Sequence, residues 1–418
     1  MHKNSEFLNF LQERGYLYQC TNLHGLNKLL LNNEYIISYI GFDCTARSLH
    51  IGSLIQIMIL RHLQKLGHKP IVVLGGCTTR IGDPSFRIKK RSILSIEEMQ
   101  KNISNIKMIL ENILSCHHEH KVETLIINNA DWLDKIKYID FLLKIGAHFS
   151  IKRMLGFESM KTRLDVQHNL SFLEFNYMIL QAYDFIELNK RYGCRVQIGG
   201  SDQWGNIING IELGKKLNLP ELFGITTPLL LNSQGCKMGK TAGGAIWLDS
   251  NMLSPNHYWQ YFRNIDDQQV GYFLKLFTDL PLNEIKKLET LKSHEINEAK
   301  KILATEVTKI CHGDKASEHA LYHAVHTFEK QEDILLPTFE INMMQALHGQ
   351  LLIDLLYITG LTSSKTSAKR VIENHGCKVN DITITDIKYV IHFKCFKKQK
   401  SIKLSVGKKN HIIVVIIQ

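Results

Sequence analysis

The chain has 418 residues, of which 44% are hydrophobic and 22% charged, and this composition is typical of a globular protein with roughly two to four domains. No apolar run approaches the roughly 20 residues that a membrane-spanning helix needs. The amino-terminal stretch has the pattern of neither a secretory signal nor a transit peptide. Nine cysteines without a C-x-x-C pair indicate neither a zinc site nor a disulfide framework, so we expect a cytoplasmic protein.

The net charge of +11 is unevenly distributed along the chain. Residues 361–418 hold twelve lysine and arginine residues against three acidic ones, a balance of +9, which leaves only +2 for the other 360 residues. A basic carboxy-terminal segment on a nearly neutral body favours a polyanionic partner, and among these a nucleic acid. A solubilising surface would carry a similar charge and is the alternative.

The first part of the chain alternates between predicted helices and strands. Residues 1–34 have helical spacing, and a β-branched strand is predicted over 35–40. A turn leads into a helix that ends near residue 66, and a second strand occupies 70–76. A strand, a helix and a strand in about 40 residues form a βαβ unit, so the two strands should lie parallel.

The turn between this first strand and its helix carries polar residues, among them Asp43, Thr45 and His50, next to Gly41 and Gly52. In an open parallel sheet, ligands bind at the carboxyl ends of the strands. A helix that begins there offers free backbone N–H groups to an anion. The turn therefore suggests a phosphate-bearing substrate, although a purely structural turn has the same pattern.

A third strand is predicted over 124–128, and residues 135–190 have helical patterns. Tyr177, Gln181 and Asp184 are spaced so that they share one helix face, which is expected to be buried. Buried glutamine and aspartate side chains need hydrogen-bond partners. This face is therefore either a structural polar cluster or a binding site.

Two further predicted strands, at 195–200 and 228–231, precede a loop that contains Lys237 and Lys240. Two lysines three residues apart in a glycine-containing loop suit a phosphate chain, although an exposed turn would have a similar sequence. We therefore expect a catalytic domain over 1–247, with a helical insertion at about 133–190. After it we expect a helical domain at 248–330, a linker at 331–346, and a small domain of helices and short strands at 347–418.

Several of these segments resemble the signature motifs of one enzyme family. His50-Ile51-Gly52-Ser53 resembles the HIGH motif of class I aminoacyl-tRNA synthetases, and Lys237-Met238-Gly239-Lys240-Thr241 resembles their KMSKS motif. Four longer segments resemble bacterial-type tyrosyl-tRNA synthetases: 41–43, 81–85, 180–185 and 197–206. Segments 364–370 and 378–381 resemble an S4 RNA-binding domain, so the resemblance covers essentially the whole chain.

The sequence departs from the family pattern at a few positions. Ser53 replaces the last histidine of HIGH, and Gly239 and Thr241 replace the serines of KMSKS. Cys44 stands where the family usually has proline. The leading histidine, the glycine of the turn and both lysines are present, so we expect activity with an altered contact to the nucleotide.

The resemblance implies a Rossmann-like parallel-sheet catalytic domain, an all-α domain and a small α+β S4 RNA-binding domain. It implies a ligase that activates tyrosine with ATP to tyrosyl-adenylate and pyrophosphate, and then transfers the tyrosyl group to the 3′-terminal ribose of tRNA(Tyr). ATP would be a substrate accompanied by Mg²⁺, with no permanently bound cofactor or metal. The partners would be tRNA(Tyr) and a second copy of the chain, with 133–160 as the expected interface, and neither DNA nor a membrane.

The resemblance also assigns roles to individual residues. The catalytic residues would be Thr45, His50, Arg87, Arg91, Lys237 and Lys240. The tyrosine-binding residues would be Tyr39, Asp83, Asn129, Tyr177, Gln181, Asp184 and Gln203. The ATP-binding residues would be Gly41, Asp43, Gly52, Ser53, Gly200, Asp202 and Lys240.

Three other functions fit parts of the sequence. A tryptophanyl-tRNA synthetase shares the framework, but it usually lacks the S4-like segment and has no use for a Tyr–Asp pair around a phenol. A non-catalytic RNA-binding protein would not need both lysines and His50. A metabolic nucleotidyltransferase with a similar turn would not need the S4-like segment.

Overall fold

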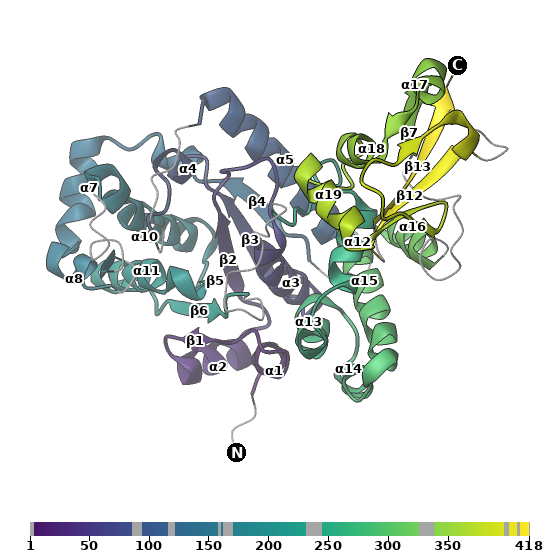
Figure 1. Ribbon diagram of the computed structural model, residues 1–418. Coiled ribbons are helices and arrows are strands. Elements are labelled where there is room, and N and C mark those ends of the chain that lie inside the picture. The colour runs from purple at the N-terminus through teal and green to yellow at the C-terminus, as the bar shows by residue number, and fades with distance from the viewer. Residues whose placement is uncertain are drawn as a thin grey trace. The chain divides into compact units, whose positions relative to one another are not determined.

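The computed structural model describes residues 4–85, 94–115, 122–157, 160–161, 170–230, 245–325, 338–396, 401–407 and 410–417 (Figure 1). The chain forms two compact units, Met1–Glu318 and His319–Gln418. In the described part of the chain, no helix has both the length and the apolar character needed to cross a membrane.

The first unit is built on a six-stranded sheet in the order β1-β6-β5-β2-β3-β4. Its strands are β1 (Gln19–Cys20), β2 (Ile37–Phe42), β3 (Lys69–Leu74), β4 (Leu125–Asn128), β5 (Val196–Gly200) and β6 (Phe223–Thr227). Five of them are parallel, and β1 pairs antiparallel with β6 at the edge. From β2 the chain builds β3 and β4 on one side and later β5 and β6 on the other, so the switch point lies between β2 and β5. Ligands bind at such a point in open α/β sheets, and the expected Rossmann-like fold is confirmed.

Two strand expectations need correction. The strand expected at 228–231 lies earlier, at β6, and residues 228–230 have no strand conformation. Pro228 follows β6 directly and cannot donate a ladder hydrogen bond, so the strand ends before it. Residues 1–34, expected to be helical throughout, also contain the edge strand β1.

Helices lie on both sides of this sheet (Figure 1). They are α1 (Glu6–Glu13), α2 (Leu23–Asn32), α3 (Ile51–Lys65), α4 (Thr78–Ile81), α5 (Ile96–Ser115), α6 (Ala130–Leu133), α7 (Tyr138–Lys144), α8 (Ile151–Leu155), α10 (Phe172–Tyr192) and α11 (Trp204–Lys216). Buried side chains of α10 and α11, including Phe185 and Leu213, pack with Tyr39 of β2 and Val73 of β3 in one core cluster. This cluster places α10 beside the switch point.

The helix α10 has clear start and stop signals. Ser171 and Glu174 form a capping box at its first turn, and Gly193 ends it in the left-handed conformation, with φ of 71°. A side chain in that conformation is strained, so glycine suits the position. The 21 residues between these signals hold Tyr177, Gln181 and Asp184, the polar face that the sequence predicts.

The remaining helices of the first unit are α12 (Pro255–Arg263), α13 (Val270–Phe277), α14 (Leu282–Glu289) and α15 (Ile296–His312). Helix α16 (Asp314–Ala324) runs across the boundary of the two units. Short 3₁₀ segments occur at Gly146–His148, Ser201–Gln203, Asp267–Gln269, Ser293–Glu295 and Phe393–Cys395. The helices up to Glu318 belong to the same compact unit as the sheet.

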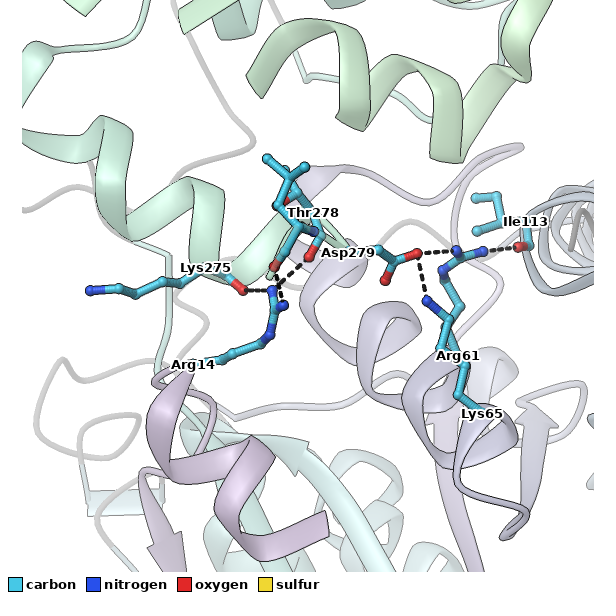
Figure 2. Close-up of polar contacts among 8 residues, drawn as sticks. Arg14, Arg61, Lys65, Ile113, Lys275, Thr278 and Asp279 are labelled. Atoms are coloured by element: carbon cyan, nitrogen blue, oxygen red, sulfur yellow. Dashed lines mark hydrogen bonds and ion pairs between the residues drawn. The ribbon is translucent and has the colours of Figure 1, made fainter. Parts of the chain in front are cut away.

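An ion cluster attaches the segment after α13 to α3 (Figure 2). Asp279 accepts hydrogen bonds from Arg61 at 2.7 Å and from Lys65 at 2.8 Å. The Arg61 side chain is fully buried and also donates to the Ile113 carbonyl at 2.9 Å. Arg14 donates to carbonyl groups of the same segment, including that of Thr278 at 2.7 Å. Although burial opposes ionisation, the two cations hold the pKa of Asp279 well below its usual range.

We expect Asp279→Asn to lower the free energy of unfolding of the first unit by about 3 kcal/mol, because Arg61 would keep its buried charge without a counter-ion. Urea denaturation at pH 7 measures this loss. Lys65→Met is the matched control, since Lys65 is more exposed than Arg61, and it should cost about 1 kcal/mol or less. Equal, small losses in both variants would contradict this role of Asp279.

The second unit contains a five-stranded sheet in the order β10-β9-β12-β13-β7. Its elements are β7 (Thr338–Asn342), α17 (Met343–His348), β8 (Gln350–Leu351), α18 (Leu352–Ile358), α19 (Lys365–Glu373), β9 (Cys377–Val379), β10 (Ile382–Thr383), β11 (Val390–Ile391), β12 (Ser401–Val406) and β13 (Asn410–Ile417). Strand β7 pairs parallel with β13, and β8 pairs with β11. Part of the expected linker at 331–346 is therefore a strand and the start of a helix within this unit, a pairing between distant residues that local sequence did not indicate.

Candidate active site

The turn after β2 leads into α3, and His50 is the N-cap residue of that helix. The Nδ1 atom of His50 accepts a hydrogen bond from the Gly52 amide at 3.0 Å, so the neutral ring carries its proton on Nε2. The Ser53 amide donates to the His50 carbonyl at 2.8 Å. Thr45 and Asp43 lie half-buried in the same turn, and Gly41 is exposed near the end of β2.

This turn is tied to the chain that follows the predicted lysine loop. His50 forms a β-bridge with Trp247. The Ile51 amide donates to the Ile246 carbonyl at 2.9 Å, and the Leu248 amide donates to the Leu49 carbonyl at the same distance. The start of α3 and the chain beyond residue 244 are thus held together by backbone hydrogen bonds.

A buried polar cluster lies beside the switch point, and we call it the Asp184 cluster; it comprises Asp184, Asn129, Trp132, Thr78 and Asp43. Trp132 Nε1 donates to Asp184 Oδ1 at 2.7 Å, and Asn129 Nδ2 donates to Asp184 Oδ2 at 3.0 Å. Asp184 is only 4% exposed. Burial raises the pKa of its carboxyl to about 7, although the two donors act in the opposite direction.

The hydroxyl group of Tyr39 is also buried at this site. Its oxygen has no hydrogen-bond partner among the residues that the structure describes. Burial, followed by the nearby negative charge of Asp184, raises the pKa of Tyr39 well above its usual value. A buried hydroxyl without a partner is costly, so a ligand group that bonds to it would be stabilised there.

The Asp184 cluster reaches the turn after β2 through Thr78. Asn129 Nδ2 donates to Thr78 Oγ1 at 3.0 Å, and Thr78 Oγ1 donates to Asp43 Oδ1 at 3.2 Å. A Cβ atom at Gly75 would lie 2.5 Å from Thr78 Oγ1 and 2.7 Å from Asp43 Oδ1. Only glycine lets the strand end approach this chain of hydrogen bonds so closely.

A second polar group, which we call the amide cluster, comprises Asp83, Gln203, Gln181 and Asn206. Gln203 Nε2 donates to Asp83 Oδ2 at 2.7 Å, and Gln181 Nε2 donates to Gln203 Oε1 at 3.3 Å. Asn206 Nδ2 donates to Gln181 Oε1 at 3.0 Å and to Gln203 Oε1 at 3.1 Å. Gln181 and Asp184 lie on the same face of α10, so this helix carries part of both clusters.

Comparisons with known proteins assign the family. Residues 31–329 match the family model described as tRNA synthetases class I (W and Y). The chain is 66% identical over 416 residues to a tyrosine–tRNA ligase of Wolbachia sp. subsp. Brugia malayi (strain TRS), covering 100% of both chains. It is 57% identical to a tyrosine–tRNA ligase of Ehrlichia ruminantium (strain Welgevonden), covering 100% of this chain and 99% of that protein.

This chain belongs to the class I tRNA synthetases, in the family of tyrosine–tRNA ligases. The resemblance predicted from the motifs is thus confirmed. The fold agrees: a C-terminally truncated mitochondrial tyrosyl-tRNA synthetase of Aspergillus nidulans superposes with a TM-score of 0.70 at 30% identity, covering 78% of this chain and 95% of that one.

For this class I synthetase, the structure brings together many but not all of the predicted site residues. Tyr39, Asn129 and Asp184 meet at the Asp184 cluster, and Asp83, Gln181 and Gln203 meet in the amide cluster. Tyr177 is buried on α10. Gly200 ends β5, and a Cβ atom there would lie 2.7 Å from Oδ1 of half-buried Asp202. Arg87, Arg91, Lys237 and Lys240 lie outside the described residues.

Three residues of the two polar clusters were not among the predicted site residues: Thr78, Trp132 and Asn206. Each lies within or next to a motif that sequence reasoning noted, but no spacing rule distinguished it from its neighbours. Their contacts cross long stretches of chain, 52 residues between Trp132 and Asp184 and 25 between Asn206 and Gln181. The available sequence signals were their positions after predicted strands and, for Asn206, its place in the family-like segment 197–206.

Proposed function

We propose that this protein is a tyrosine–tRNA ligase that forms tyrosyl-adenylate from tyrosine and ATP and then transfers the tyrosyl group to tRNA(Tyr). The observation that carries this proposal is that a buried carboxylate, Asp184, lies near the buried hydroxyl of Tyr39, which has no hydrogen-bond partner within the described part of the chain. A phenol hydroxyl can donate to the first and accept from the second. The names of the full-length relatives support the same activity.

The amide cluster suits the other end of a bound amino acid. The Asp83 carboxylate and the Gln181 carbonyl oxygen are acceptors, which is what an α-ammonium group requires. Buried Tyr177 lies on the same helix as Gln181 and completes the proposed ammonium site. Gln203, which joins Asp83 to Gln181, would lie near the carboxylate of the substrate.

The first chemical step needs little proton transfer. An oxygen of the tyrosine carboxylate attacks the α-phosphorus of ATP, and the bond from that phosphorus to the pyrophosphate oxygen breaks. Because the nucleophile is already an anion, the step depends on alignment and on stabilising charge on the phosphate oxygens. We assign that role to Thr45 and His50 in the turn before α3, with Arg87, Arg91, Lys237 and Lys240.

Adenosine would lie over the end of β2, the first turn of α3 and the end of β5. We assign Gly41, Asp43, Gly52, Ser53, Gly200 and Asp202 to this part of the site, together with Lys240. Magnesium would arrive with ATP, whose phosphates bind it, as part of the substrate.

The test is ATP–pyrophosphate exchange measured with tyrosine, with tryptophan and with no amino acid. Exchange with tyrosine alone is expected. Exchange that prefers tryptophan would assign the chain to the sister specificity, and exchange without an amino acid would indicate a nucleotidyltransferase. No exchange under any condition would leave an RNA-binding protein on a synthetase scaffold and overturn the proposal.

Tyrosine binding should weaken about tenfold as the pH falls from 8 to 6. The pKa of Asp184 is raised to about 7, so its carboxyl is mostly ionised at pH 8 and mostly protonated at pH 6. The ionised form only accepts hydrogen bonds, as the phenol O–H requires, whereas the protonated form carries an O–H group of its own. Equilibrium dialysis with labelled tyrosine measures the effect. The Asp184→Asn variant, whose side chain cannot ionise, should bind tyrosine weakly and without this pH dependence. If the variant kept the same pH dependence, the titrating group would be a residue other than Asp184.

The ionisation of Asp184 also acts on stability. Since its folded pKa lies above the ordinary value, the folded chain holds this proton more tightly than the unfolded chain does. The contribution of this group to stability therefore decreases as the pH rises from about 4 to about 7. The buried charge is a cost that the site bears for substrate recognition.

The tRNA partner is assigned to the carboxy-terminal parts of the chain. We propose that the helical segment 248–330 and the S4-like segment 347–418 both bind tRNA(Tyr). On α19, Lys369 and Arg370 are exposed cations of that segment. We also place the protein in the cytoplasm, the compartment in which bacterial tRNA is charged.

A homodimer is the assembly that we propose. Large apolar side chains are exposed on α7, α8 and the start of α10: Tyr138, Ile139, Leu143, Ile151, Phe172 and Leu173, each at least half exposed. Such a group of apolar side chains marks an interaction surface. It overlaps the interface expected at 133–160, and sedimentation at micromolar concentration would show whether two copies associate.

A further inference from the structure

Asn206 lies in the first turn of α11 and is only 3% exposed. Its side-chain nitrogen donates to the Oε1 atoms of both Gln181 and Gln203, at 3.0 Å and 3.1 Å. A primary amide has two N–H groups, so these bonds use both of them. Asn206 thus makes a donor contact to the two glutamines of the amide cluster at once.

These two bonds determine which way each glutamine amide faces. With both oxygens turned toward Asn206, the nitrogen of Gln181 donates to Gln203 and the nitrogen of Gln203 donates to Asp83. Turning either amide around would set an N–H group against the N–H groups of Asn206. The orientation of the whole cluster therefore depends on one side chain that carries no charge.

We propose that Asn206 is a positioning residue that orients Gln181 and Gln203 to receive the ammonium group of the amino acid. This inference rests on the proposed function and adds a residue to it. The carbonyl oxygen of Gln181 keeps a second lone pair for the ammonium group. A reversed amide would present its N–H group to that cation, which is repulsive.

The fold explains why this position can act on both glutamines. Gln203 is the residue directly before α11, and Asn206, three residues after Gln203, lies in the first turn of that helix. The two therefore lie on one face of the helix start. Gln181 comes from α10, which packs along α11. One side chain at this helix junction therefore contacts a glutamine from its own segment and one from the neighbouring helix.

The experiment compares two ligands that differ only in an ammonium group, tyramine and 4-ethylphenol. Their dissociation constants are measured by direct binding to the full chain, for the native protein and for Asn206→Leu and Asn206→Ala. Leucine has the same number and branching of side-chain heavy atoms as asparagine but has no donor. Asn209→Leu is the matched control, since Asn209 is equally buried on the same helix and its Nδ2 has no partner among the described residues.

We expect both Asn206 variants to weaken tyramine about tenfold and 4-ethylphenol less than twofold, because the lost interaction involves a charged group. The ratio of the two constants should stay native in Asn209→Leu. A change of equal size for both ligands, or no change for either, would leave the ratio native and overturn the proposal, because Asn206 would then have no effect specific to the ammonium group. Binding is measured without ATP, so a failure of tyrosine-dependent exchange in the native chain is a separate result that bears on the proposed function.

Discussion

Replacing Asp184 with alanine should reduce the preference for tyrosine over phenylalanine by at least about a hundredfold. The buried carboxylate would give tyrosine a charge-assisted hydrogen bond, whereas with phenylalanine bound it would keep only the donors Trp132 and Asn129 and lack the one from the phenol. Together these effects amount to about 3 kcal/mol or more, and each 1.4 kcal/mol is about a factor of ten. The measurement is kcat/KM for both amino acids in ATP–pyrophosphate exchange.

The matched control for this variant is Asp131→Ala, which removes an exposed carboxylate on α6, next to Trp132 in the sequence. It should leave the discrimination unchanged. Asp184→Asn is a second variant that keeps an acceptor for Trp132 or Asn129 and so preserves more of the local packing. If the ratio of kcat/KM values stays native in both Asp184 variants, Asp184 does not contact the phenol.

Removal of the chain after Val325 should spare adenylate formation and reduce tRNA charging by about a hundredfold or more. The division into two compact units places this cut outside the first unit, and a C-terminally truncated relative from Aspergillus nidulans has a solved structure. The S4-like segment carries most of the net charge, which contributes electrostatic affinity for the phosphates of RNA. Exchange and aminoacylation are measured in parallel over a range of salt concentrations.

A full-length variant tests the same idea without a truncation. Lys369→Glu with Arg370→Glu reverses two exposed charges on α19 and should raise the KM for tRNA and flatten its salt dependence. Lys28→Glu, a reversal on the exposed surface of α2, is the control and should charge tRNA normally. Native charging by the truncated chain would show that the S4-like segment has another purpose.

Much of the fold could be predicted because local pattern determines local structure. The apolar, β-branched runs that became β2 and β3, and the capping residues that bound α10, depend on near neighbours in the sequence. The prediction was wrong at β6, where Pro228 ends the strand, and at β7, which lies in a segment that was expected to be a linker. A strand such as β7 is stabilised by pairing with β13, and that partner is not visible locally.

Only part of the candidate site could be predicted, because spacing and motifs describe short stretches of the sequence. Spacing alone placed Gln181 and Asp184 on one helix face, and the family motifs supplied Tyr39, Asp83 and Gln203. No pattern indicated which of these side chains bond to one another.

The sequence by itself determined most of the helices and strands around the switch point, the family motifs and the basic carboxy-terminal segment, since these depend on residue type and short spacing. Only the tertiary structure decided that Trp132 and Asn129 hold the Asp184 carboxylate, that Thr78 joins this cluster to Asp43, and that Asn206 orients the two glutamines. The physical reason is that hydrogen bonds require donor and acceptor within about 3 Å. For residues far apart in the chain, only the packing of the sheet and helices brings them to that distance.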